Sequence, residues 1–236
     1  MTMSALIVGA AGGIGAALAR ALCADPAIGT VHGWAREAGT ITPHARLCRT
    51  SVDCLDEDQI QSAAATLENP GLVIIATGML HSSTHKPEKS WKQLTADGLG
   101  QSFAANTIAP ALVLKHVLPR LDRSSPARLG VLSARVGSIS DNELGGWYGY
   151  RASKAALNQI IKTAAIELAR KWPEAALVGI HPGTVDTGLS APFQAGVKHP
   201  IFTPDEAASR LLAVLKNRTA QHSGRCFDFA GAEIPA

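Results

Sequence analysis

The sequence predicts an α/β fold in which one doubly wound parallel sheet of about seven strands carries helices on both faces. Two observations predict this class. Short apolar runs of strand length alternate with longer helical patterns along the whole chain, an order typical of parallel sheets. No linker, repeat or low-complexity stretch divides the 236 residues, so we expect a single domain over residues 1–236.

The first part of the chain alternates strand and helix and then forms a loop. Residues 5–8 predict a buried strand because they are short, apolar and followed by glycine. The Ala- and Leu-rich residues 14–23 predict a helix that an Asp-Pro pair ends. Further strands are expected at 30–34 and 47–52. Residues 37–45, between them, contain glycine and proline without a helical period and predict a loop.

The rest of the chain continues the alternation. Residues 56–67 predict a helix with acidic residues in its first turn, where the helix dipole favours negative charge, and residues 71–77 predict the fourth strand. A long helix is expected at 97–121, a fifth strand at 128–133 and a second long helix at 148–171. The last elements expected are strands at 175–180 and 226–229 and a helix at 204–216.

Charge and composition exclude several classes of protein. Lys and Arg total 22 against 19 Asp and Glu, and a net charge of +3 is too small for a nucleic-acid-binding surface. The longest apolar runs have strand length, so we expect no membrane-spanning helix, and the first residues lack the features of a signal peptide. The four cysteines lack CxxC spacing and predict reduced thiols in a cytoplasmic protein. His81 and His85 have no third ligand nearby, so no metal site is expected.

A glycine-rich turn follows the first predicted strand. Residues 9–15 read GAAGGIG, a G-x-x-x-G-x-G spacing that differs from the G-x-G-x-x-G fingerprint of dinucleotide sites. Glycines here allow a sharp strand-to-helix turn and let a phosphate approach backbone amides at a helix N-terminus. The turn therefore predicts a dinucleotide site, and an ordinary strand–helix turn is the alternative.

The end of the second predicted strand indicates which dinucleotide binds. An acidic residue there would accept from the 2′-hydroxyl of NAD, whereas an arginine would pair with the 2′-phosphate of NADP. The sequence has Arg36 just past this strand, and Glu37 lies further into the loop. We therefore expect NADP(H) rather than NAD(H), with a surface arginine that has no role as the alternative.

Tyr150 and Lys154 stand four residues apart, on one face of the predicted helix at 148–171. A nearby ammonium favours phenolate, so the sequence predicts a lowered pKa for Tyr150 and a role as general acid–base. The other tyrosine, Tyr148, lies on a different helical face. The pair follows the fifth strand, close to the sheet edge where ligands bind in such folds.

With these motifs, the sequence resembles the short-chain dehydrogenase/reductase family over nearly its whole length. The family's glycine loop, helix asparagine, Tyr/Lys pair and P-G-x-V-x-T turn match residues 9–15, Asn106, Tyr150 with Lys154, and residues 182–187. Residues 137–148 resemble the C-factor and sniffer-type carbonyl reductase branch. The resemblance implies a Rossmann-type fold and an NADPH-dependent oxidoreductase that reduces a carbonyl group.

The resemblance also implies a role for each residue of the site. Tyr150 would donate a proton to the substrate carbonyl, Lys154 would hold the nicotinamide ribose, and Asn106 would support a proton-relay water. Asp53 would lie by the adenine and Gly78 beneath the cofactor. The implied cofactor-binding residues are Gly9, Gly13, Ile14, Gly15, Arg36, Asp53, Ala76, Gly78, Tyr150, Lys154, Val185 and Thr187.

Departures from the family pattern affect the site. Ala134 occupies the position of the family's catalytic serine, and Ser133 precedes it. Although a one-residue shift in a strand turns a side chain to the opposite face, Ser133 is our first candidate for this role and Ser138 the second. Residues 75–78 read IATG where the family has NNAG, and the helix usual between the second and third strands is missing.

The segment at 188–203 is expected to cover the substrate. Its apolar residues suit a small, mostly apolar carbonyl or alcohol compound, and packing of the segment on its own core is the alternative. Trp91, Trp147 and Phe193 are candidate pocket residues. The resemblance implies a homodimer or homotetramer formed through the two long helices. The alternative to catalysis is an NAD(P)-binding regulatory or signalling protein with little turnover.

Overall fold

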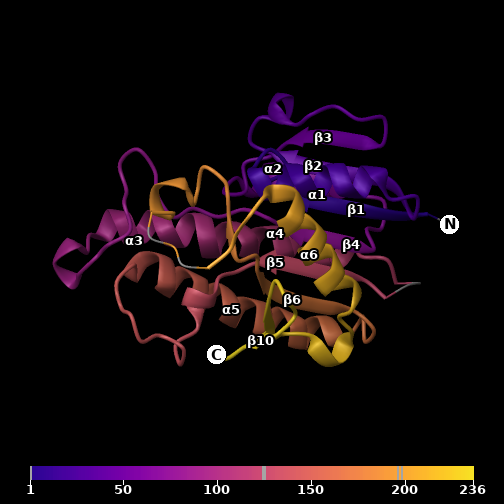
Figure 1. Ribbon diagram of the computed structural model, residues 1–236. Helices are drawn as coiled ribbons and strands as arrows, with labels where there is room; N and C mark the ends of the chain where they lie inside the picture. Colours follow the sequence, from indigo (N-terminus) through magenta and orange to yellow (C-terminus); the bar gives the residue numbers. More distant parts are fainter. Residues whose placement is uncertain (1, 124–125, 196, 198) are drawn as a thin grey trace.

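The main sheet has eight strands in the order β10-β9-β6-β5-β4-β1-β2-β3 in the computed structural model, which describes residues 2–123, 126–195, 197 and 199–236 (Figure 1). The strands are β1 (Met3–Val8), β2 (Ile28–Ala35), β3 (Leu47–Ser51), β4 (Leu72–Ile75), β5 (Arg128–Leu132), β6 (Ala176–His181), β9 (Cys226–Asp228) and β10 (Glu233–Ile234). All neighbours are parallel except β10, which pairs antiparallel with β9. The predicted fold class is confirmed. The sequence does not reveal β10, because two residues are too few to show an alternating pattern.

Two further strands, β7 (Thr184–Val185) and β8 (Ile201–Phe202), pair in parallel outside the main sheet. Next to this pair, the backbone N–H of Asp186 donates a 2.8 Å hydrogen bond to the carbonyl of Phe202. The chain between β7 and β8 therefore forms a loop whose two ends are held together by this pairing. Most of the predicted substrate segment lies in this loop.

Helices cover both faces of the sheet. They are α1 (Gly13–Ala24), α2 (Glu57–Ala65), α3 (Ala96–Phe103), α4 (Ala109–Val117), α5 (Tyr148–Ala169) and α6 (Pro204–Lys216). Helices α1 and α6 pack together on one face, and α2, α4 and α5 cover the other (Figure 1). Between β2 and β3 the chain forms one 3-10 turn at Ala38–Thr40 and no α-helix, in agreement with the predicted loop.

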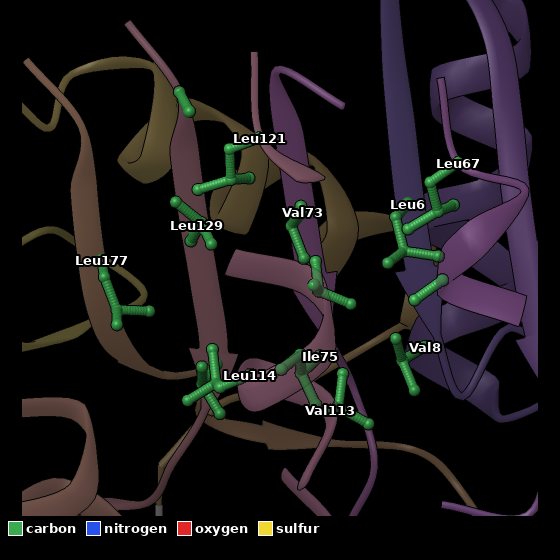
Figure 2. Packing of buried hydrophobic residues seen from close by; sticks show 14 of the residues in the cluster. Leu6, Val8, Leu67, Val73, Ile75, Val113, Leu114, Leu121, Leu129 and Leu177 are labelled. Carbon is green, nitrogen blue, oxygen red and sulfur yellow. The ribbon is translucent and has the colours of Figure 1, made fainter. Parts of the chain in front are cut away.

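Side chains alternate along the strands between two apolar cores. In β1, Leu6 and Val8 pack with residues of α2, α4 and α5, in what we term the α5-side core. Ala5 and Ile7 pack with α1 and α6, in the α1-side core. Figure 2 shows the α5-side core, where Leu6, Val8 and Ile75 point into the same layer. The same alternation decides which layer the last residue of each strand faces.

The predicted helix at 97–121 is interrupted by a π-helical turn at Ala104–Ile108 between α3 and α4. Pro110 has no N–H to donate to the carbonyl of Asn106, so a regular α-helical bond is impossible there. The N–H of Ala109 instead donates to a carbonyl five residues earlier. Such widened turns frequently occur at functional sites, and this one carries the predicted Asn106.

Candidate active site

A cavity of about 940 Å³ opens beyond the carboxyl ends of β1, β4, β5 and β6, the edge where doubly wound sheets bind their ligands. The predicted site residues that line it are Gly13, Ile14, Gly15, Ala76, Gly78, Ser133, Tyr150, Lys154, Val185 and Thr187. Gly9, Arg36, Asp53 and Asn106 lie outside this lining. One cavity thus joins the glycine turn to the predicted catalytic pair.

The glycine turn forms a cradle that side chains would fill. Gly9 has a φ of +86°, which favours glycine. A Cβ on Gly15 would lie 2.0 Å from the carbonyl oxygen of Gly9, and one on Gly13 would lie 2.6 Å from Cγ2 of Thr187. Helix α1 begins here with neither a side-chain cap nor an acidic residue in its first turn. Its positive end is therefore open to an anionic group such as a pyrophosphate.

Tyr150 and Lys154 both project from α5 into the cavity. Lys154 Nζ donates a 2.8 Å hydrogen bond to the carbonyl of Leu132 and lies 5.9 Å from the centre of the Tyr150 ring. Burial lowers the pKa of Lys154 to about 8 and raises the pKa of Tyr150 to about 12. The predicted lowering of the Tyr150 pKa is therefore wrong, because burial disfavours the charged phenolate and raises the pKa instead.

Asn106 supports the chain segment that follows β4. Its Oδ1 accepts from the backbone N–H of Met79 at 2.8 Å, and its Nδ2 donates to the carbonyl of Met79 at 2.8 Å and to Ser153 Oγ at 3.1 Å. A Cβ on Gly78 would lie 3.4 Å from Asn106 Oδ1 and 3.5 Å from Lys154 Nζ. The structure therefore brings Asn106, Gly78 and Lys154 together, although they are far apart in the sequence.

Both predicted serines are hydrogen-bonded within the protein, and of the two Ser133 lines the cavity. Ser133 Oγ donates to Asn158 Oδ1 of α5 at 2.6 Å, and Cys226 Sγ donates to the same oxygen at 3.2 Å. Ser138 does not line the cavity, and its Oγ donates to the carbonyl of Ala236 at 3.4 Å. Ala134, between them, does line the cavity, where its methyl group offers no hydrogen-bond donor.

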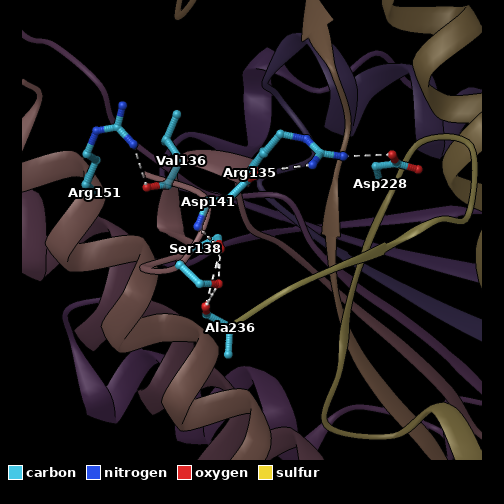
Figure 3. A network of polar contacts seen from close by, with 8 residues as sticks. Arg135, Val136, Ser138, Asp141, Arg151, Asp228 and Ala236 are labelled. Carbon is cyan, nitrogen blue, oxygen red and sulfur yellow. Dashed lines mark hydrogen bonds and ion pairs between the residues drawn. The ribbon is translucent and has the colours of Figure 1, made fainter. Parts of the chain in front are cut away.

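A polar network holds the segment after β5, as Figure 3 shows. Arg135 pairs with Asp141 at 3.2 Å and with Asp228, at the end of β9, at 3.0 Å. Arg151 of α5 donates to the carbonyl of Val136 at 3.3 Å. Arg135 and Asp228 line the cavity, and the sequence analysis missed both because their partners come from distant parts of the chain.

Arg36 and Asp53 follow the carboxyl ends of the adjacent strands β2 and β3. Ala35, the last residue of β2, pairs with Ser51, the last residue of β3. Arg36 and Asp53 are both exposed, and Asp53 Oδ1 accepts from the backbone N–H of Leu55 at 3.0 Å. The two side chains are thus available to a ligand that extends from the glycine turn toward β3.

Aromatic rings close the cavity opposite the sheet. Trp147 lies 5.4 Å from Phe193 and 6.2 Å from Tyr150, centre to centre, and His81 lies 5.7 Å from Phe193. His81 Nε2 also lies 3.0 Å from the carbonyl oxygen of Gly188. Trp147 and Phe193 line the cavity as expected, whereas Trp91 is 69% exposed and does not.

Trp147 is held in an unusual backbone conformation just before α5. Its φ is +52°, in the left-handed region, and its N–H donates to the carbonyl of Glu88 at 2.5 Å. The carboxylate of Glu88 is buried and accepts from Gly149 in the first turn of α5. Sequence analysis missed Glu88, since no local pattern marks a buried acid in a loop.

The described residues offer neither a membrane-spanning helix nor a metal-binding cluster. None of the helices is both long and apolar enough to span a bilayer. No three or more His, Cys, Asp or Glu side chains in the described part of the chain gather where they could hold a metal ion.

The family model for short chain dehydrogenase matches residues 3–198. The chain therefore belongs to the short-chain dehydrogenase family and is an NAD(P)-dependent oxidoreductase. It is 31% identical over 174 residues to 1-hydroxy-2-glutathionyl-2-methyl-3-butene dehydrogenase of Rhodococcus sp. (strain AD45), with 74% of each chain covered. It is 33% identical over 138 residues to C-signal of Myxococcus xanthus, covering 58% of this chain and 78% of that protein.

Solved structures share the whole fold. Carbonyl reductase Sniffer of D. melanogaster matches over 100% of both chains with a TM-score of 0.85 and 20% identity. A short-chain dehydrogenase/reductase from Burkholderia multivorans with bound NADP matches over 100% of both chains with a TM-score of 0.81 and 25% identity. The predicted resemblance to the C-factor and sniffer-type branch is confirmed.

Proposed function

We propose that the protein is an NADPH-dependent reductase of a carbonyl group on a small, mostly apolar substrate. The observation that carries this proposal is the position of Tyr150 and Lys154, which share one cavity with the glycine turn. A proton donor, a neighbouring cation and a phosphate cradle are the groups that the reduction of a carbonyl by a nicotinamide requires of the protein.

NADP(H) is the proposed cofactor. The 25% identical structure from Burkholderia multivorans contains NADP, and the uncapped N-terminus of α1 beside the glycine turn suits a pyrophosphate. Arg36 would pair with the 2′-phosphate and Asp53 would lie by the adenine. The residues that would hold the other parts of the cofactor are Gly9, Gly13, Ile14, Gly15, Ala76, Gly78, Tyr150, Lys154, Val185 and Thr187. When bound, NADPH supplies a hydride equivalent to the carbonyl carbon.

Tyr150 donates the proton in this proposal. Because burial raises its pKa to about 12, the phenol is protonated at neutral pH and able to give its proton to the more basic alkoxide oxygen. The Lys154 ammonium, 5.9 Å from the ring, stabilises the phenolate that remains. Asn106 orients the segment beneath the substrate through Met79. Ser133 anchors α5 through Asn158 and leaves the proton transfer to Tyr150.

The shape and lining of the cavity support the proposed substrate class. Trp147, Phe193 and Leu189 contribute apolar side chains to the cavity lining, and Ala134 adds a methyl group. A compact aldehyde, ketone or quinone with an apolar body matches this lining. The segment at 188–203, apart from residues 196 and 198, which lie outside the described residues, contributes to the wall.

The assembly and location remain predictions. We retain the homodimer or homotetramer through the long helices and the cytoplasmic location that the sequence analysis favours. A regulatory protein that binds NAD(P) with little turnover is not favoured, because Tyr150, Lys154 and Asn106 are assembled around one cavity.

Cofactor binding and turnover test the proposal directly. The purified protein is titrated with NADPH and NADH by nicotinamide fluorescence, and a panel of aldehydes, ketones and quinones is then screened for NADPH oxidation. Tyr150→Phe should abolish turnover and keep NADPH affinity within about twofold, whereas the matched variant Tyr148→Phe should keep both. Binding without turnover on any carbonyl, or full activity in Tyr150→Phe, would overturn the proposed chemistry.

A further inference from the structure

Reduction of a carbonyl places negative charge on its oxygen, and donors that are already aimed at that oxygen stabilise the charge best. Tyr150 supplies one hydroxyl. Several cationic and hydroxyl side chains nearby already have hydrogen-bond partners: Lys154 donates to Leu132, Ser133 donates to Asn158, and Arg135 pairs with two carboxylates. Ala134 offers no donor at all. A further donor from another element would add to the stabilisation of this charge.

His181 is a candidate for such a donor. It ends β6, and Ser133, at the end of the neighbouring β5, donates its N–H to the carbonyl of Ile180 at 2.9 Å. Ile180 packs into the α1-side core, so strand alternation turns His181 toward the layer that contains Tyr150 and Lys154. His181 lines the cavity with both of these residues.

The hydrogen bonding of His181 is incomplete in the protein alone. Its Nδ1 is buried and has no hydrogen-bond partner among the described residues. Burial and the charge of Arg135 lower the pKa of His181 to about 4, so the imidazole is neutral at neutral pH. Asp228 opposes this shift, and His199 and Lys154 add to it. An orphaned buried N–H is rarer than an orphaned acceptor, which favours the tautomer with its proton on Nε2.

Among the described residues, Thr77 is the other polar side chain of the cavity lining with a buried, unpartnered atom, its Oγ1. It belongs to the cofactor half of the cavity, because a Cβ on Gly9 would lie 3.3 Å from the Thr77 nitrogen. His181 instead lies beside Ser133, because β5 and β6 are paired neighbours, and it lines the cavity with Ala134 and Tyr150. This difference in position selects His181 as the donor to the substrate.

We propose that His181 is a catalytic residue whose Nε2–H holds the substrate's carbonyl oxygen beside the Tyr150 hydroxyl, in place of the donor that Ala134 lacks. The proton that ends on the alcohol comes from Tyr150, and His181 keeps its own proton throughout. This inference rests on the proposed reductase function. It adds a second oxygen-binding donor from β6 to the one from α5.

Three variants test the role of His181, with 4-nitrobenzaldehyde as the carbonyl probe. His181→Phe keeps a ring without an N–H and should lower kcat/KM about 100-fold, with NADPH affinity within about twofold of the wild type. His181→Gln, which keeps a donor, should retain activity within about tenfold. Adding Ala134→Ser to His181→Phe should restore at least tenfold. The matched control His44→Phe, at an exposed histidine outside the cavity, should change kcat less than about threefold.

A spectroscopic measurement gives a second, independent readout. Nitrogen NMR of the imidazole should show neutral His181 with its proton on Nε2 at pH 7. A protonated ring, a proton on Nδ1, or full activity in His181→Phe would overturn the proposal. If His181→Phe does not fold, the tautomer and the activity of His181→Gln decide it. An inactive wild type would instead contradict the proposed reductase function, and the two failures are thereby distinguished.

Discussion

The backbone N–H of Gly149 donates a 3.1 Å hydrogen bond to Oε2 of Glu88, a carboxylate only 3% exposed. Gly149 immediately precedes Tyr150, so the loop after β4 caps the helix that carries the proton donor. A negative charge at a helix N-terminus is favourable. The helix end is also tightly packed, because a Cβ on Gly149 would lie 2.9 Å from Ser102 Oγ. The placement of Tyr150 thus depends on a residue far outside its own helix.

Removing the Glu88 carboxylate is expected to weaken both the fold and the site. Glu88→Ala should lower the free energy of unfolding by about 1–3 kcal/mol, because the N–H of Gly149 loses its buried acceptor. It should also raise the KM for the carbonyl substrate, because Trp147 lies next to this contact. Urea denaturation and steady-state kinetics measure the two effects. The exposed Glu143→Ala is the control, and equal behaviour of the two variants would contradict the argument.

The rate of carbonyl reduction is expected to fall above about pH 8. The pKa of Lys154 is about 8, so its ammonium is present below that pH and lost above it, while Tyr150, with a pKa of about 12, stays protonated. The loss of positive charge removes the stabilisation of the Tyr150 phenolate. A kcat/KM profile from about pH 6 to about pH 10 measures this. Because Lys154→Arg keeps its positive charge over this range, its kcat/KM should not fall above about pH 8. A flat wild-type profile would contradict the role given to the Lys154 charge.

Gly15→Ala is expected to abolish tight cofactor binding. The new Cβ would lie 2.0 Å from the carbonyl oxygen of Gly9, so the turn must distort. We expect NADPH affinity to fall more than about tenfold and the free energy of unfolding to fall by about 1–3 kcal/mol. Fluorescence titration and urea denaturation measure these quantities. Gly39→Ala, where no atom lies within 4 Å of the added Cβ, is the matched control and should behave as wild type.

Arg36→Ala is expected to remove the preference for NADPH over NADH. A charge-assisted pair with the 2′-phosphate contributes about 1.5–3 kcal/mol, so the Kd for NADPH should rise about 10- to 100-fold while that for NADH stays constant. Isothermal titration with each nucleotide measures the difference. The exposed Lys92→Ala serves as the charge control. An unchanged NADPH preference in Arg36→Ala would show that another residue recognises the phosphate.

Features set by local pattern could be predicted from the sequence. Apolar runs marked the strands, and the spacing between Tyr150 and Lys154 placed both on one helical face that does line the cavity. The glycine turn at 9–15 was recognised because its glycines serve a backbone requirement that other residues cannot meet. Each of these features depends on residues within a few positions of one another.

Features set by distant contacts could not be predicted. Ser133 and His181 become neighbours only because β5 pairs with β6, and Asp228 joins them through β9. The pKa of Tyr150 depends on burial, which a sequence does not reveal, and the expected direction of its shift was wrong. Glu88 lies 61 residues from the helix that it caps.

The π-helical turn at Ala104–Ile108 amounts to one extra residue within a stretch that is otherwise α-helical. Deleting Ala105 would restore the regular repeat, and α3 and α4 would keep their relative orientation because the wide turn already absorbs the extra residue. Val113 and Val117 would stay in the core, whereas the turn that carries Asn106 would tighten and Asn106 would lose its contacts with Met79 and Ser153. A single-residue deletion here would therefore disturb the candidate site and leave the core packing in place.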